Sequence, residues 1–543
     1  MKTVYLTFCD SAERFPDKDF LHIPLAAARH YSEQAIDLSY REALLATREL
    51  RALYLQAGYG TGHRVALLLQ NRAEFLLHWF ALNSLGTCVV PINDEMAAEE
   101  QAYIINHSEA SLLVHLPELA EKVATLQPLL DAAPACQSTV QMEQLTNAAS
   151  TATGAAPGLQ SECAILYTSG STGKPKGCIL TNEYFLLSGQ RYVDLGELCA
   201  MEDGCERLAT PLPLVHMNAM ACSTLAMILT GGCIIQLDRF HPRSWWQSVR
   251  ESRASIVHYL GVMPAMLLSM DPQEGPGGDD FSSQIKFAFG AGVNPKHHAA
   301  FEQRFGFPLI EAWGMTETGN FGAIIANREP RHVSSCCFGH TPEHLEIKLV
   351  DEAGAVVPQG EPGELLLRHR GEQPRRGFFS GYLKNAEATA EAWADGWFHT
   401  GDVVRQDEEG ALYFVDRRKN VIRRSGENIS ALEVEAALAG VSAIQMAVVC
   451  PVPDDIRGDE VMACVIPAEG AARDQQGAEH IVRAALESLV YFKVPGYIAF
   501  TDSLPLTASE KPKRGDIKAL ATSLLERGEC YDVRHLKKRQ RET

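Results

Sequence analysis

Hydroxyl groups, glycines and lysines are concentrated in residues 167–177, which read Tyr-Thr-Ser-Gly-Ser-Thr-Gly-Lys-Pro-Lys-Gly. Glycines let backbone N–H groups approach phosphate oxygens, hydroxyls donate hydrogen bonds, and lysines contribute positive charge. The segment is not a Walker A loop, because Pro175 resists helix entry directly after Lys174. The apolar runs at 164–167 and 178–180 are typical of buried strands and disfavour a merely solvated loop. We therefore expect a polyphosphate, with ATP as the first candidate, to contact Thr168, Ser169, Gly170, Ser171, Thr172, Gly173 and Lys176.

A second group of chemically capable residues lies at 312–319, Ala-Trp-Gly-Met-Thr-Glu-Thr-Gly. Trp313 offers a flat face for a purine, Gly314 permits close approach of a ligand, and Glu317 has a carboxylate that could hold Mg²⁺. A glutamate in a turn is usually a solvated charge. The buried-looking run at 307–310 directly before this segment favours the ligand role instead.

A third group joins a carboxylate to a cluster of basic residues further along the chain. Asp402 follows a glycine turn in Trp-Phe-His-Thr-Gly-Asp, and its two oxygens are suited to accept hydrogen bonds from a ribose diol. Arg417 opens a run in which five basic residues fall within the eight positions 417–424. Considered alone, such a run would be a solvated patch.

Composition limits the classes of protein and partner. The chain has 543 residues, 46% of them hydrophobic and 22% charged, which predicts a soluble protein with two or more domains. The net charge of −19 disfavours nucleic acid and anionic membranes as main partners. Fourteen cysteines without a Cys-x-x-Cys pair indicate neither a zinc site nor a disulfide framework, so we expect a cytoplasmic protein. The uncharged run 219–237 contains a Gly-Gly pair and is predicted to be a buried helix, turn and strand rather than a membrane span.

The elements that must position these residues alternate along the N-terminal part of the chain. Strand-like runs at 65–69, 88–92, 111–114 and 233–237 alternate with helix-like runs at 41–57 and 73–85. This alternation predicts crossover units of a parallel sheet. Later runs at 345–350, 363–368 and 411–415 lie between glycine turns and favour an antiparallel meander.

We expect an α/β fold with two domains. Residues 1–418 would form a large N-terminal ATP- and acyl-binding domain with parallel-rich sheets and a small β-barrel-like part. Residues 419–543 would form a small, mobile α+β C-terminal lid domain. Its elements are predicted from helix-like runs at 433–439 and 481–489 and strand-like runs at 443–450 and 461–466.

Taken together, the three groups resemble the signatures of the adenylate-forming superfamily, which contains acyl-CoA synthetases, nonribosomal adenylation domains and luciferases. The resemblance extends over nearly the whole chain. It implies that Thr316 contacts phosphate, Glu317 holds magnesium, and Asp402 and Arg417 bind ribose. It also implies that Lys419 is the hinge between the two domains.

The resemblance extends to the adenine and acyl parts of the site. Residues 289–295, Phe-Gly-Ala-Gly-Val-Asn-Pro, resemble the adenine-side loop of the family, with Gly290 and Ala291 near the base. His216 matches the family's aromatic or histidine position beside the substrate carboxylate; a histidine between apolar residues is otherwise more often a core residue. The implied acyl pocket is formed by His216, Asn218, Gly261, Gly292 and Asn320.

The C-terminal motif at 504–514 resembles a family pattern that ends in Ser-Gly-Lys, two variable residues and Arg. Lys511 is then the implied catalytic lysine. Glu510 replaces the family's glycine and Pro512 stiffens the next position, so Lys513 is the alternative. The loop that lines the pantetheine tunnel in the family corresponds to Arg424, Ser425 and Gly426.

The resemblance implies an ATP-dependent carboxylate–CoA ligase of the crotonobetaine/carnitine-CoA ligase type. Such an enzyme forms an acyl-adenylate and pyrophosphate, then an acyl-CoA thioester and AMP, here from a short or medium-chain or polar acid. ATP, Mg²⁺ and coenzyme A are the implied cofactor and co-substrates, and the implied catalytic residues are Lys511, Glu317, Thr316 and His216. Two alternatives remain: an adenylating enzyme that loads a carrier protein or another nucleophile, and a non-catalytic nucleotide-binding regulator.

Overall fold

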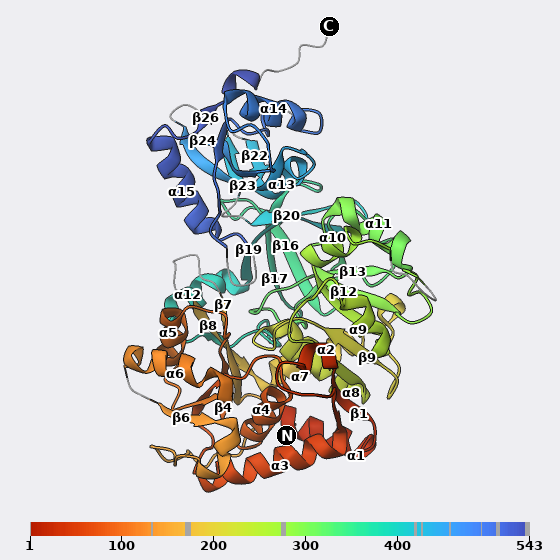
Figure 1. Ribbon diagram of the computed structural model, residues 1–543, viewed down its shortest axis with the longest axis vertical. Coiled ribbons are helices and arrows are strands. Elements are labelled where there is room, and N and C mark those ends of the chain that lie inside the picture. The colour runs from red at the N-terminus through yellow and green to blue at the C-terminus, as the bar shows by residue number, and fades with distance from the viewer. Residues whose placement is uncertain are drawn as a thin grey trace. The chain divides into compact units, whose positions relative to one another are not determined.

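The computed structural model describes residues 2–131, 134–168, 175–272, 278–417, 421–424, 427–454, 458–489, 491–506 and 511–537. The chain divides into two compact units (Figure 1). Unit 1 comprises Met1–Ile347, Leu367–Phe398 and Gly410–Leu412, and unit 2 comprises Lys348–Leu366, His399–Glu409 and Tyr413–Thr543. Lys419, the predicted hinge, lies outside the described residues, so the division into 1–418 and 419–543 stays a prediction.

Unit 1 contains a seven-stranded sheet with the order β18-β8-β7-β4-β3-β5-β6. The pairs of β3 with β4 and β5, of β4 with β7, and of β5 with β6 are parallel, whereas β8 pairs antiparallel with β7 and β18. The strands are β3 (Arg64–Leu68), β4 (Cys88–Pro91), β5 (Leu112–His115), β6 (Ala135–Ser138), β7 (Glu162–Thr168), β8 (Lys176–Thr181) and β18 (Gly381–Tyr382). The helices between and after these strands are α4 (Ala73–Ser84), α5 (Ala98–Ser108), α6 (Ala120–Leu126) and α12 (Ala386–Ala392).

The second sheet of unit 1 has eight strands in the order β14-β13-β12-β11-β9-β10-β1-β2. Its inner pairs, from β13 to β1, are parallel, and both edge strands are antiparallel. The strands are β1 (Asp19–Ile23), β2 (Ile36–Ser39), β9 (Arg207–Thr210), β10 (Cys233–Gln236), β11 (Ile256–Leu260), β12 (Phe287–Ala291), β13 (Leu309–Trp313) and β14 (Ile324–Ile325). The associated helices are α1 (Val4–Arg14), α2 (Leu25–Ala28), α3 (Tyr40–Gln56), α7 (Asn182–Val193), α8 (Thr224–Thr230), α9 (Trp245–Glu251), α10 (Val262–Leu268) and α11 (Pro295–Phe305).

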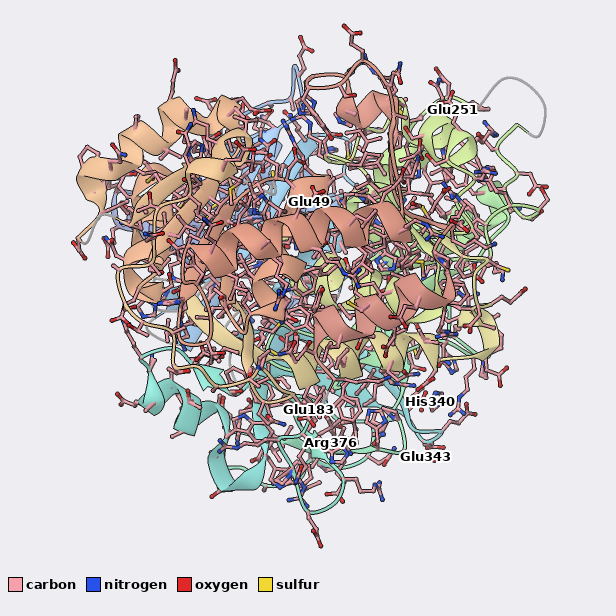
Figure 2. All side chains as sticks on the ribbon, turned by 90° about the horizontal axis from the view of Figure 1, so that it is seen from below. Glu49, Glu183, Glu251, His340, Glu343 and Arg376 are labelled. Carbon is pink, nitrogen blue, oxygen red and sulfur yellow. The ribbon has the colours of Figure 1, made fainter. Side chains whose placement is uncertain are left out.

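Local sequence explains where several of these helices begin. Ser39 and Glu42 form a capping box at the start of α3, and Thr181 caps α7 by accepting from the Tyr184 N–H. Figure 2 shows α3 crossing one face of the molecule, with Glu49 on its exposed side. The helix buries Ala43, Leu44, Thr47 and Tyr54 on the opposite side, as its helical spacing predicts.

The uncharged run at 219–237 contains three short elements rather than one long helix. A π-helical turn covers Asn218–Ser223, α8 follows over Thr224–Thr230, and β10 begins at Cys233. Gly231 has a φ of +67° and ends α8 in the left-handed region. The predicted helix, turn and strand are therefore confirmed. Among the described residues, no helix is both long and apolar enough to cross a membrane.

A third sheet has five strands in the order β15-β20-β19-β17-β16. The division falls inside several of its strands, so they contribute residues to both units. The strands are β15 (Cys337–His340), β16 (Leu345–Val350), β17 (Gly363–His369), β19 (Phe398–Gln406) and β20 (Ala411–Arg417).

The C-terminal part of unit 2 is a sheet with helices on both faces. The order is β22-β21-β24-β25-β26, and β23 pairs with β24. Alternate residues of the strands face two separate apolar clusters, one formed with α13 and α14 and the other with α15 (Figure 1). The elements are β21 (Val421–Arg424), β22 (Glu427–Ser430), α13 (Ala431–Leu438), β23 (Ile444–Asp454), β24 (Gly458–Pro467), α14 (Gln475–Ala485), β25 (Tyr497–Phe500), α15 (Arg514–Glu526) and β26 (Tyr531–Asp532). A large α/β unit and a smaller α+β region confirm the predicted fold class.

Candidate active site

Four predicted site segments follow neighbouring parallel strands of the eight-stranded sheet. The strands β9, β11, β12 and β13 are adjacent and parallel, so their carboxyl ends meet at one edge. The strands themselves are largely buried, but the residues at and after their ends return to the surface. The exposed members of this edge are His216, Ala291, Gly292 and Gly314, and Gly261 is half-buried. The structure therefore brings together the predicted adenine-side and acyl-side residues.

Two glycines at this edge are required by close backbone approach. A Cβ atom on Gly261 would lie 1.8 Å from the Gly292 carbonyl oxygen. A Cβ atom on Gly290 would lie 2.2 Å from the Tyr259 carbonyl oxygen. Real Cβ atoms do not approach carbonyl oxygens so closely, so any other residue would push the loop after β12 outward.

Glu311 holds the same loop in place from inside the sheet. Its carboxylate accepts hydrogen bonds from the Gly292 and Val293 N–H groups, each at 3.0 Å, and from the Tyr259 hydroxyl at 2.7 Å. Burial raises the pKa of Glu311. Sequence reasoning missed this residue, because a glutamate inside an apolar strand gives no signal of its three partners.

Glu317 lies in a polar cluster that includes a tyrosine from a distant part of the chain. The Tyr382 hydroxyl donates to Glu317 Oε1 at 2.8 Å, and Glu317 is only 5% exposed. Burial, and secondarily the charge of Glu317, raise the pKa of Tyr382, so its hydroxyl stays protonated and donates. Glu317 Oε2 belongs to a carboxylate, the ligand type that Mg²⁺ prefers, so the donor chemistry fits a magnesium ion.

Lys176 completes this cluster from the phosphate-binding segment. Its ammonium nitrogen lies 4.9 Å from the centroid of the Tyr382 ring. Lys176 pairs across the β7–β8 ladder with Thr168, the other described end of the segment. The predicted contacts Ser169, Gly170, Ser171, Thr172 and Gly173 lie outside the described residues. Lys176 and Glu317 thus both contact Tyr382.

Other predicted residues of unit 1 have structural partners. The Thr316 carbonyl oxygen accepts from the Tyr184 hydroxyl at 2.8 Å, which ties the motif to α7. The Asn320 amide donates to the Ser188 carbonyl oxygen at 3.1 Å and is almost fully buried. Trp313 is also buried, and its ring centroid lies 6.1 Å from that of Phe338. Their ligand contacts stay predictions.

In unit 2, the predicted ribose-binding residues Asp402 and Arg417 are next to each other. Arg417 Nε lies 3.4 Å from Asp402 Oδ1. Asp402 is 5% exposed, and its N–H donates to the Thr400 hydroxyl at 3.0 Å. The Asp402 carboxylate is therefore largely buried, while Arg417 is half exposed at the end of β20.

Lys511, the predicted catalytic lysine, is exposed. Local desolvation, and secondarily the charge of Arg417, lower the pKa of Lys511. Arg514, which follows in the same motif, pairs with Glu435 through two contacts of 2.9 and 2.7 Å. Arg514 therefore anchors the segment that carries Lys511 to α13. Residues 507–510, including the unusual Glu510, lie outside the described residues.

The residues predicted to face coenzyme A are described only in part. Ser425 and Gly426 lie outside the described residues. Arg424 is buried, and its Nε donates to both carboxylate oxygens of Glu460 at 2.8 Å. Lys537 also contacts Glu460, at 2.5 Å, so this buried carboxylate has two cationic partners. A role of Arg424 toward coenzyme A stays a prediction.

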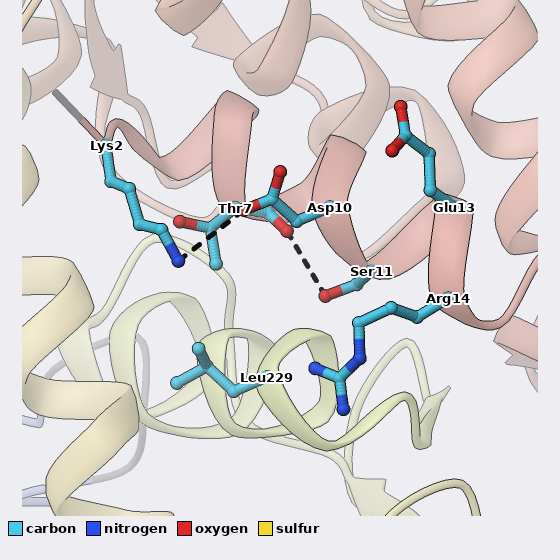
Figure 3. Close-up of a pocket in the computed structure, with 7 residues that line it drawn as sticks. All are labelled: Lys2, Thr7, Asp10, Ser11, Glu13, Arg14 and Leu229. Carbon is cyan, nitrogen blue, oxygen red and sulfur yellow. Dashed lines mark hydrogen bonds and ion pairs between the residues drawn. The ribbon is translucent and has the colours of Figure 1, made fainter.

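A hollow lies elsewhere on unit 1, beside α1 and α8 (Figure 3). It encloses about 420 Å³ and is lined by Lys2, Thr7, Asp10, Ser11, Glu13, Arg14 and Leu229. Both of its basic groups are paired, Lys2 with Asp10 at 3.5 Å and Arg14 with Asp203 at 3.0 Å. No predicted site residue lines this hollow, so we assign the site to the strand ends.

Comparison of the sequence with known proteins supports the family that the sequence motifs indicate. A family model described as "AMP-binding enzyme" matches residues 8–383, and one described as "AMP-binding enzyme C-terminal domain" matches residues 433–511. Crotonobetaine/carnitine–CoA ligase of Escherichia coli is 31% identical over 494 residues, which cover 88% of this chain and 93% of that protein. The Shigella sonnei protein of the same name is 31% identical over 495 residues, with coverage of 88% and 93%.

Solved structures share the fold at lower sequence identity. The o-succinylbenzoate CoA synthetase (MenE) of Bacillus subtilis, in complex with the acyl-adenylate intermediate OSB-AMP, has a TM-score of 0.79 and 22% identity. The match covers 95% of this chain and 98% of that chain. The anthranilate CoA ligase AuaEII, in complex with anthranoyl-AMP, has a TM-score of 0.81 and 20% identity, with coverage of 97% and 98%. These structural similarities show that this chain has the same fold as those two enzymes.

Proposed function

Because this chain belongs to the AMP-binding enzyme family of the adenylate-forming superfamily, we propose that it is an ATP-dependent carboxylate–CoA ligase. The observation that carries the proposal is the meeting of Lys176 and Glu317 at Tyr382, because it joins the phosphate-binding segment to a carboxylate suited to magnesium. The E. coli and S. sonnei relatives are named CoA ligases, which supports coenzyme A as the acceptor.

In the first half-reaction, a carboxylate oxygen of the acid attacks the α-phosphorus of ATP. An O–P bond forms, the bond from the α-phosphorus to the bridging oxygen breaks, and pyrophosphate leaves. Lys511 neutralises negative charge at the α-phosphoryl group, and the segment from Thr168 to Lys176 holds the leaving pyrophosphate. Glu317 would hold Mg²⁺, which supplies charge neutralisation at the phosphates, and Thr316 would contact phosphate.

The adenosine and acyl parts are assigned to the strand-end edge and to unit 2. Asp402 and Arg417 bind the ribose hydroxyls, and Gly290, Ala291, Trp313 and Gly314 form the adenine side. His216 orients the substrate carboxylate at the entrance to the acyl pocket, which Asn218, Gly261, Gly292 and Asn320 complete. The close approach of the Gly261 and Gly292 backbones, and the open space beside the Gly292 Cα atom, support this assignment.

In the second half-reaction, the thiolate of coenzyme A attacks the acyl carbon of the adenylate. The C–S bond forms, the C–O bond to the phosphate breaks, and AMP leaves. We assign the loop of Arg424, Ser425 and Gly426 to the coenzyme A side. We assign Lys419 to the hinge about which the C-terminal domain would rotate between the two half-reactions. Water must be excluded between the steps, because it would hydrolyse the mixed anhydride.

The proposed substrate is a short or medium-chain or polar carboxylic acid, and the proposed location is the cytoplasm. The test is release of AMP and pyrophosphate from ATP with Mg²⁺ across a panel of carboxylic acids, with and without coenzyme A, followed by mass analysis. An acid that yields AMP and its CoA thioester supports the proposal. Adenylate that coenzyme A cannot discharge would assign another acceptor, and no turnover across the panel would favour a regulatory nucleotide-binding protein.

A further inference from the structure

A buried histidine connects β11 and α7 to the start of the predicted acyl segment. His258 Nε2 lies 2.9 Å from the Tyr192 hydroxyl, and its Nδ1 lies 3.0 Å from Ser223 Oγ and 2.8 Å from Asn218 Oδ1. The ring is fully buried and packs beside Phe289, with centroids 5.3 Å apart. These contacts fix both ring nitrogens of His258.

The proton of Ser223 determines which nitrogen of His258 carries hydrogen. Ser223 has one hydroxyl proton, and it is donated to the Asn218 carbonyl oxygen at 3.1 Å. Ser223 Oγ must therefore accept from His258 Nδ1, and Nε2 accepts from Tyr192. Burial lowers the pKa of His258 to about 3, so the ring stays neutral.

This tautomer sets the orientation of the Asn218 amide. The Nδ1–H group of His258 requires an acceptor, so the amide oxygen of Asn218 is turned inward toward the histidine. The amide nitrogen is then turned away, and Asn218 is half-buried. Among the described residues, this nitrogen donates no hydrogen bond. Asn218 opens the π-helical turn Asn218–Ser223, two residues after the exposed His216, and such turns are frequent at functional sites.

We propose that Asn218 is a specificity residue whose amide donates a hydrogen bond to an oxygen acceptor on the acyl part of the substrate. The preferred substrate is then a carboxylic acid with a second oxygen function, such as a hydroxyl or carbonyl group, rather than an unsubstituted alkanoate. Tyr192, Ser223 and His258 are positioning residues that hold the amide in this orientation. The inference rests on the proposed ligase function and narrows its substrate class.

The test compares matched pairs of acids that differ only by replacement of a methylene or methyl group with a carbonyl or hydroxyl group. The measured quantity is kcat/KM for CoA thioester formation with each member, across acids of three to eight carbons. We expect the wild type to prefer the oxygen-bearing member of at least one pair by about tenfold or more, because the bound plain acid would cover the Asn218 donor and leave it unpaired.

Two variants separate the donor from the rest of the side chain. Asn218→Asp keeps an oxygen for His258 but replaces the donor with an acceptor, so the preference should vanish or reverse. Asn218→Leu removes both the amide oxygen and the amide donor, so the ratio of kcat/KM between the two acids of a pair should be near one. The KM for ATP should stay within about twofold of wild type in both, which shows that the adenosine site is intact. If Asn218→Leu does not fold, Asn218→Asp alone decides.

Tyr192→Phe tests the positioning role. It removes the hydroxyl that donates to His258 Nε2 and should lower the preference by reducing kcat/KM for the oxygen-bearing acid. A wild type that makes thioesters without preference in any pair would overturn the inference and leave the ligase function standing. If Asn218→Asp still prefers the oxygen-bearing acid, the inferred role of Asn218 is also overturned. No thioester from any acid would overturn the proposed function and the inference with it.

Discussion

Lys511 combines an exposed ammonium group with the nearby charge of Arg417. If Lys511 stabilises charge at the α-phosphoryl group, Lys511→Ala should lower the rate of adenylate formation by about 100-fold or more. ATP–pyrophosphate exchange measures that step directly. Lys513→Ala is the matched control, because it removes the alternative lysine and should keep most of the activity. The reverse pattern would move the catalytic role to Lys513.

The pH dependence of adenylate formation should follow the protonation of Lys511. Desolvation and Arg417 lower the pKa of Lys511, so the group loses its proton below the pH at which an ordinary lysine does. Because the protonated form is the active one, the exchange rate should fall as pH rises through this lowered pKa. Lys511→Arg stays charged and should lose this alkaline decline. An identical decline in Lys511→Arg would assign it to another group.

Tyr382 should support metal binding at Glu317 without itself contacting the metal. Its hydroxyl orients the carboxylate through the 2.8 Å hydrogen bond, and loss of such an outer partner typically costs about 10–100-fold in metal affinity or activity. Tyr382→Phe should therefore raise the Mg²⁺ concentration that gives half-maximal exchange. An unchanged Mg²⁺ dependence in a correctly folded variant would contradict this role.

The residues that sequence reasoning missed have partners far away in the chain. Glu317 was predicted from its motif, but Tyr382 lies 65 positions later and reaches it only through the pairing of β18 with β8. His258 and Asn218 are 40 positions apart. Tertiary pairing of this kind leaves no local pattern, so motif residues were predictable and the residues that orient them were not.

At the scale of elements, the edge formed by β9, β11, β12 and β13 depends on backbone that no side chain obstructs. Gly261→Ala would place a Cβ atom against the Gly292 carbonyl oxygen and displace the loop after β12. We expect kcat/KM for thioester formation to fall by about 100-fold, since small displacements in a site have large effects. Gly515→Ala is the control, because a Cβ there meets nothing within 4 Å. Equal activity of both variants would contradict the assignment of this edge.

Element types were predictable because the period of apolar residues differs between helices and strands. The predicted helices at 41–57 and 433–439 correspond to α3 and α13, and the predicted strands at 65–69 and 88–92 correspond to β3 and β4. The sequence did not reveal the order of strands in the sheets. For example, β1 pairs with β10, which lies more than two hundred residues later. No local sequence pattern indicates this pairing.

At the scale of the whole molecule, the account requires that the predicted C-terminal domain, residues 419–543, changes its arrangement between the half-reactions. Lys419→Pro would fix φ at the predicted hinge. We expect one half-reaction to survive within about threefold and the other to fall at least tenfold, because a fixed hinge retains a single arrangement. ATP–pyrophosphate exchange and thiolysis of preformed acyl-adenylate measure the two steps separately. Equal rates of both steps in the variant and the wild type would contradict a hinge at Lys419.

The central claim is that the carboxylate attacks the α-phosphorus of ATP, and transfer of oxygen isotope tests it most directly. An accepted acid labelled with ¹⁸O in its carboxylate is turned over with ATP and coenzyme A, and the nucleotide and phosphate products are analysed by mass. Attack at the α-phosphorus leaves one carboxylate oxygen on AMP, so AMP should gain one ¹⁸O and pyrophosphate none. Unlabelled AMP, or label in released phosphate with ADP as the nucleotide product, would contradict the account.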